Sequence, residues 1–181
     1  MKNFLLISFA IFFLHACGNQ ETDRDWNSYK TPYFQIKYPE KFEFMKKGQH
    51  NEKGDLMLQQ AEFFLYLDDS LSLDKNEFQA NINLLIQDLS GLSYDLSKFS
   101  KTSEKQIVNL IKNAKIIESK TNKNHHRIKY SGELDGRDLF FYQHYELNNN
   151  QAYILTFSSA YRKFEAYLPV VDSVFSSFQI K

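Results

Sequence analysis

Two histidines and a glutamate in the C-terminal half of the chain have the residue types and the spacing of metal ligands. The dipeptide Asp135-Gly136 favours a two-residue β-hairpin turn, and aromatic and branched residues flank it on both sides. Such a turn places His125 opposite Glu146 and makes His144 a diagonal neighbour of His125 on the same face. These three side chains could then bind zinc or copper through two imidazoles and a carboxylate.

The same surface, which we call the histidine face, has a second interpretation. In this register Arg127 lies opposite His144 and Lys129 lies opposite Tyr142, so the face could carry cross-strand ion pairs that each contribute little to stability. The other face of the hairpin is apolar and carries Ile128, Tyr130, Leu139, Phe141 and Tyr145. We therefore expect the apolar face to meet the core and the histidine face to lie in water, with a metal site as the alternative.

The only cysteine, Cys17, follows a segment that is typical of a secretory signal. Lys2 precedes an apolar run over residues 4–14, which is shorter than the roughly 20 residues that a membrane-spanning helix needs. Residues 14–17, LHAC, resemble the bacterial lipobox, in which the cysteine becomes the lipid-modified N-terminus. A single cysteine also leaves no partner for a disulfide and no Cys-rich metal site.

The lipobox resemblance implies a lipoprotein signal peptide over residues 1–16, lipidation at Cys17 with acyl chains such as palmitate, and a lipidated tether over 17–31. Two or more chains give stable anchoring, because each buried methylene contributes about 0.8 kcal/mol. His15 departs from the small residue usual at its position, and the alternative is a cleaved signal followed by a spare thiol. Gly18 follows the cysteine in place of an aspartate, which implies the outer membrane of a bacterial envelope more than the inner one.

Charge and motifs exclude several function classes. Cleavage after residue 16 removes one of the 22 Lys and Arg residues and none of the 22 Asp and Glu residues, which leaves a net charge of −1. A chain without excess positive charge is poorly suited to neutralise phosphates, so we expect no nucleic-acid binding. The sequence has no G-x-S-x-G motif, phosphate loop or dinucleotide fingerprint. We expect a protein that is not an enzyme and uses no cofactor.

The hydrophobic pattern predicts one domain over residues 32–181. Strands are expected at 33–39, 57–67, 78–91, 115–121, 125–134, 137–147 and 151–159. A helix is expected within 93–114, capped by Asp95 or Ser97, and a second one from about Tyr167, with Pro169 in its first turn. Strands followed by a helix, four more strands and a helix predict an α+β fold: an antiparallel sheet of about six to seven strands flanked by helices.

Four segments, whose patterns are those of packed strands and helix ends, resemble a known family. They are residues 34–39 (FQIKYP), 81–84 (NINL), 153–157 (YILTF) and 176–180 (SSFQI). With the element order, they resemble the PsbP-like (Mog/PsbP) domain family, which includes DcrB-like bacterial lipoproteins. The resemblance implies a PsbP-like α/β sandwich and a non-enzymatic role beside a membrane complex. It transfers no functional residue, because the matching positions are structural.

These features lead to two functional hypotheses. The first is a lipid-anchored envelope lipoprotein whose non-catalytic PsbP-like domain is accessory to another envelope protein. The alternative is a ligand- or metal-binding lipoprotein that uses the His125/His144/Glu146 face.

Overall fold

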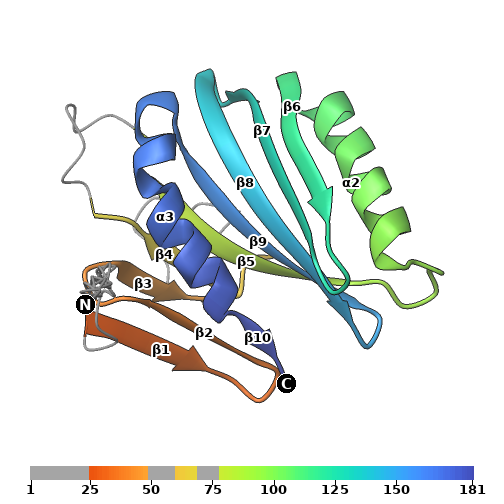
Figure 1. Cartoon of the computed structure of the whole chain (residues 1–181), viewed down its shortest axis with the longest axis horizontal. Coiled ribbons are helices and arrows are strands. Elements are labelled where there is room, and N and C mark those ends of the chain that lie inside the picture. The colour runs from red at the N-terminus through yellow and green to blue at the C-terminus, as the bar shows by residue number, and fades with distance from the viewer. Residues whose placement is uncertain (1–24, 49–59, 69–77) are drawn as a thin grey trace, which may run out of the picture.

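A computed structural model describes residues 25–48, 60–68 and 78–181 of the chain. These residues form two antiparallel sheets and two long helices arranged as an α+β sandwich, which confirms the predicted fold class (Figure 1). The predicted signal peptide and Cys17 lie outside the described residues. None of the described helices combines the length and the apolar character needed to cross a membrane.

The larger sheet has seven strands in the order β3-β4-β5-β9-β8-β7-β6. Its strands are β3 (Glu43–Lys46), β4 (Phe63–Tyr66), β5 (Asn81–Asp88), β6 (Lys112–Thr121), β7 (His126–Leu134), β8 (Arg137–Asn148) and β9 (Gln151–Ala160). The four consecutive strands β6 to β9 confirm the prediction for this part of the chain. The predicted strand over 57–67 is shorter than expected, since of its described residues only those of β4 are in a strand.

The smaller sheet joins the beginning and the end of the domain. It consists of β1 (Trp26–Lys30), β2 (Phe34–Pro39) and β10 (Gln179–Ile180) in the order β1-β2-β10. The predicted tether, 17–31, overlaps β1, so the folded part of the chain begins before residue 32. The polar sequence of β1 forms a strand because its two aromatic side chains, Trp26 and Tyr29, pack against the core, with the Tyr29 and Phe44 ring centroids 4.7 Å apart. Asn27, Ser28 and Lys30 are exposed.

Helix α2 (Leu96–Leu110) follows β5 and begins as predicted. The Asp95 carboxylate accepts a hydrogen bond from the backbone N–H of Lys98 at 2.7 Å, which satisfies one of the unpaired donors in the first turn. Phe99 and Ile107 are the buried apolar residues of the helix. They pack on the face of the large sheet that carries Tyr145 and Ile128.

Helix α3 (Tyr161–Ser177) begins earlier than predicted and contains Pro169 in its interior. Burial of Phe164 against Phe157, at a centroid distance of 5.5 Å, stabilises the turns before the proline. Proline in a helix removes one N–H···O=C bond, which is tolerated more easily where the freed carbonyl can bind water. Pro169 is exposed, which is the environment in which the loss of this hydrogen bond is tolerated. The packing of Phe164 therefore outweighs the preference of proline for the first turn of a helix, on which the prediction rested.

The two faces of the large sheet have separate hydrophobic cores. Helix α3 and the small sheet cover one face, and α2 packs on the other (Figure 1). The first core includes Phe34, Ile36, Phe63, Leu84, Leu155, Phe157, Val171, Val174 and Phe175. The second includes Phe99, Ile107, Ile128, Tyr130, Phe141 and Tyr145. Side chains on both faces of β8 are therefore buried, whereas in β7 buried residues alternate with half-buried ones.

The β7–β8 hairpin has the predicted register. Leu134 pairs with Arg137 across the turn, and the pairing continues to Arg127 opposite His144. Asp135 and Gly136 have φ values of 51° and 73°, which match a two-residue turn with both central residues in the left-handed region.

Candidate functional site

Helix α3 covers the His144 end of the histidine face, so this end does not lie in water as predicted, whereas Arg127 and Lys129 remain partly exposed. His144 is only 2% exposed, and its ring centroid is 5.8 Å from that of Phe175 in α3. His125 stacks on His144 with ring centroids 4.8 Å apart, and His125 itself is half-buried. The predicted hairpin register correctly made the two histidines neighbours. Their burial depends on helix α3, which is far away in sequence.

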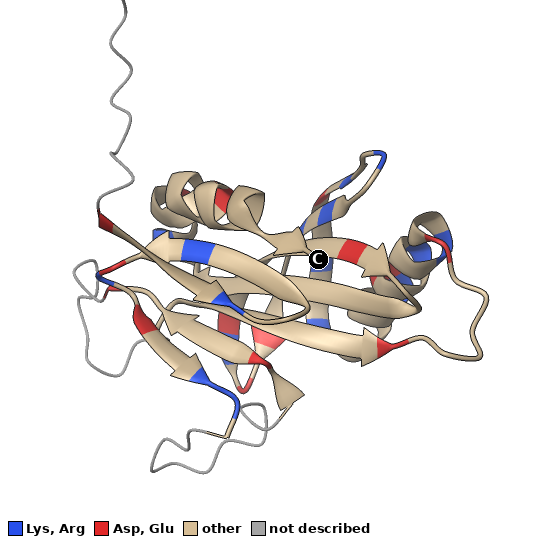
Figure 2. Ribbon diagram, turned by 90° about the horizontal axis from the view of Figure 1, so that it is seen from below, with Lys and Arg blue, Asp and Glu red and all other residues tan. Residues whose placement is uncertain are grey.

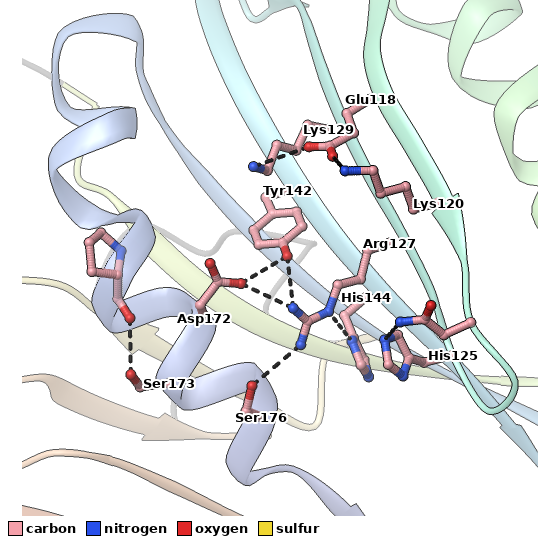
Figure 3. A network of polar contacts seen from close by, with 12 residues as sticks. Glu118, Lys120, His125, Arg127, Lys129, Tyr142, His144, Asp172, Ser173 and Ser176 are labelled. Carbon is pink, nitrogen blue, oxygen red and sulfur yellow. Dashed lines mark hydrogen bonds and ion pairs between the residues drawn. The ribbon is translucent and has the colours of Figure 1, made fainter.

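Arg127 is the centre of a polar network that joins the sheet to α3 (Figure 3). Its Nη1 donates to the Asp172 carboxylate and to the Tyr142 hydroxyl, each at 3.2 Å. Its Nη2 lies 3.4 Å from the Ser176 hydroxyl oxygen, and its Nε donates to Nδ1 of His144 at 3.2 Å. The Tyr142 hydroxyl in turn donates to Asp172 at 2.9 Å. One guanidinium thus holds two strands and one helix in a fixed arrangement.

The hydrogen bonds of His144 determine which ring nitrogen carries its proton. Because Nδ1 accepts from Arg127, Nε2 carries the hydrogen and donates to the Glu146 carboxylate at 2.7 Å. Neither nitrogen keeps a lone pair for a metal ion in this arrangement. Among the residues that the structure describes, no group of three His, Cys, Asp or Glu side chains is placed to hold a metal.

Beside Arg127 lies an open groove of about 240 Å³ between β6, β7 and α3. We call it the Arg127 groove, and its charged lining consists of Glu118, Lys120, Arg127, Lys129 and Asp172. Lys120 and Lys129 both bind the Glu118 carboxylate, with Lys129 Nζ 3.3 Å from Oε2. The two ammonium groups hold the pKa of Glu118 below its usual value. Every charged side chain of the groove therefore has an ionic partner.

Burial shifts the pKa values of two groups around Arg127 in opposite directions. Burial, followed by the hydrogen bond to Asp172, raises the pKa of Tyr142 to about 12, so the phenol stays protonated. Burial lowers the pKa of His125, and the neighbouring His144 ring and Arg127 guanidinium lower it further. In these states the Tyr142 hydroxyl can donate a hydrogen bond, and the His125 ring can donate one and accept one.

Sequence reasoning missed the α3 residues of this site. Asp172 and Ser176 are four residues apart and thus lie on one side of the helix. That spacing could have indicated a polar helix face, but it does not reveal which strand residues it meets.

Basic and acidic positions are intermixed along the strands and helices of the described chain (Figure 2). This distribution agrees with the balanced composition of the whole sequence. A surface of mixed charge favours local pairing over long-range attraction to a polyanion. The absence of nucleic-acid binding stays a prediction.

Comparison with known proteins supports the fold. No family model and no curated protein matches the sequence. The structure is similar to cyanobacterial PsbP (CyanoP) from Synechocystis, with a TM-score of 0.56, 14% identity, and coverage of 93% of this chain and 99% of the other.

Two further solved structures are similar. LpqN, described as involved in cell envelope biogenesis of Mycobacterium tuberculosis, has a TM-score of 0.56 and 7% identity, with coverage of 86% of this chain and 91% of LpqN. PA94, a Pseudomonas aeruginosa protein of unknown function, has a TM-score of 0.51 and 10% identity, with coverage of 82% and 92%. At these identities the similarity concerns architecture and not activity. The chain has a PsbP-like fold.

Proposed function

We propose that this chain is a lipid-anchored protein of a bacterial envelope whose PsbP-like domain is a non-catalytic binding module, accessory to another envelope protein. The observation that carries the proposal is the Arg127 network. Its polar groups bind one another across two strands and α3, which supports a structural role for them in preference to a role around a reacting group.

The envelope location rests on Cys17 and on structural similarity. The signal-like segment before Cys17 supports export and lipidation. LpqN, which has the same fold, is described as involved in cell envelope biogenesis, and this supports an envelope role here. We propose the outer membrane in preference to the inner membrane because Gly18 follows the cysteine.

Crosslinking in intact cells followed by affinity capture of the anchored protein tests this function. The proposal predicts repeated recovery of the same envelope protein. Capture that yields no reproducible partner contradicts it.

The metal-binding alternative is less well supported by the geometry. His144 uses both ring nitrogens within the protein, and a metal would have to displace Arg127 or Glu146. Metal analysis of the purified protein at neutral pH provides the test. A stoichiometric zinc or copper ion that disappears in His144→Asn would support the alternative over the binding module.

A further inference from the structure

A second cavity lies where the β1–β2 hairpin meets the end of the large sheet. Its volume is about 560 Å³, and it shares no lining residue with the Arg127 groove. The hairpin contributes Tyr33 and Phe34, and strands β5 and β9 contribute Ile86, Asp88 and Tyr153. Residues that are far apart in sequence therefore form this cavity.

The cavity has an apolar floor and an aromatic rim. Phe34 and Tyr153 are 2% and 3% exposed, and the half-buried Ile86 pairs with Tyr153 across the strands. Tyr33 is 66% exposed although it belongs to the lining. An exposed aromatic ring beside a buried apolar floor offers contact area to an incoming group.

The charged residues of the lining are both acids, Glu62 and Asp88. Hydrogen bonds from Ser90 lower the pKa of Asp88, so this carboxylate is ionised at neutral pH. Glu62 binds the ammonium of Lys47 at 2.7 Å, and the Lys47 side chain is half exposed. Lys47 thus pairs with one carboxylate from outside the lining, and Lys181 Nζ binds the carbonyl of the lining residue Thr31 at 2.6 Å. The negative charge that the cavity offers to a ligand is therefore mainly that of Asp88.

We infer that this cavity binds a basic side chain, arginine or lysine, of the partner protein. The inference rests on the proposed function and adds the chemistry of the contact. The aliphatic stem of such a side chain would pack on the half-buried Ile86 and the exposed Tyr33 ring, and its charged end would reach Glu62 and Asp88. The Tyr33 ring adds a surface for a cation–π contact, which favours arginine.

Titration of the full-length protein in detergent micelles with Nα-acetyl-arginine amide tests the inference. NMR shifts of the cavity residues are expected to saturate at millimolar probe, the range for a small fragment. Nα-acetyl-citrulline amide has nearly the same shape without the charge. We expect it to bind at least about threefold more weakly, as for loss of an exposed ion pair.

Matched variants separate charge recognition from shape. Asp88→Asn and Glu62→Gln are each expected to weaken arginine binding about two- to fivefold. Lys47→Gln frees the Glu62 carboxylate and is expected to tighten binding. Glu165→Gln, which removes an exposed carboxylate of α3 outside the lining, serves as the control and should leave binding unchanged.

Three results would overturn the inference. The first is a shift that stays linear with probe concentration, and the second is equal binding of arginine and citrulline probes. The third is saturable binding of a neutral sugar such as N-acetylglucosamine, unaffected by Asp88→Asn, which would identify a carbohydrate site instead.

If the probe fails but crosslinking still recovers a partner, only the cavity assignment is wrong. If the probe binds and no partner is recovered, the basic-group site stands and the proposed function fails.

Discussion

Arg127 of β7 and Asp172 of α3 form an ion pair, with Nη1 and Oδ1 3.2 Å apart, that connects the large sheet to the last helix. The two side chains are 26% and 46% exposed, so solvent screens the charge interaction. The contact matters mainly because it fixes the position of the Arg127 guanidinium, which also binds Tyr142 and His144.

Replacement of Arg127 by methionine should destabilise the protein by about 1–3 kcal/mol, because Asp172, Tyr142 and His144 lose a shared donor. Asp172→Asn should cost less, about 0.5–1 kcal/mol. Urea unfolding of both single variants and the double variant measures the coupling, which we expect to be about 0.5–1 kcal/mol. Lys101→Met on the exposed side of α2 is the control. Strictly additive effects would contradict the network.

Stability should decrease as the pH falls below about 6.5, because burial lowers the pKa of His126 in the folded state. His126 is 1% exposed, and its Nε2 lies 3.6 Å from Glu104 and has no hydrogen-bond partner among the residues that the structure describes. Since the unfolded chain binds the proton more readily, stability is fully present above the unfolded pKa and declines on acidification.

The unfolding free energy measured between about pH 7.5 and 5.5 checks this expectation in a window above the usual carboxylate pKa values. His126→Gln should reduce the pH dependence, while His125, whose pKa is also lowered by burial, retains a share. An unchanged pH dependence in His126→Gln would show that the buried imidazole is not responsible.

Gly132→Ala should destabilise the β6–β7 pairing by about 1–3 kcal/mol, because a Cβ at this buried position would overlap the Ile111 side chain. Ile111→Ala in the same chain should recover part of the loss by making room. Thermal unfolding of the two single variants and the double variant provides the measurement. A double variant as unstable as the sum of the single ones would exclude the steric explanation.

Local signals in the sequence predicted the parts of the fold that depend on neighbouring residues. The Asp135-Gly136 turn specified the β7–β8 register, and Asp95 specified the start of α2. Both effects act within a few residues, so sequence alone contains them.

Tertiary packing decided the features that the sequence did not reveal. Helix α3 extends ahead of Pro169 because Phe164 is buried against the large sheet, and His144 is buried because α3 lies over it. The candidate site was only half predicted for the same reason. The strand residues Arg127 and His144 followed from the hairpin, whereas Asp172 comes from an element whose position no local pattern specifies.

Replacement of Cys17 by serine should release the protein from the membrane fraction or leave it unprocessed, because serine cannot carry the lipid thioether. Fractionation and the mass of the N-terminal peptide measure both outcomes. A Cys17→Ser protein that is processed and still bound to the membrane would contradict lipid anchoring.

The central claim, that this domain is an anchored binding module, is tested most directly by crosslinking in intact cells. The tagged wild-type protein and Cys17→Ser are crosslinked, captured under denaturing conditions and compared by mass spectrometry. We expect the wild type to recover one envelope protein in every replicate and the unanchored variant to recover much less of it. Recovery of no reproducible partner by the correctly processed, membrane-bound wild type would contradict the account.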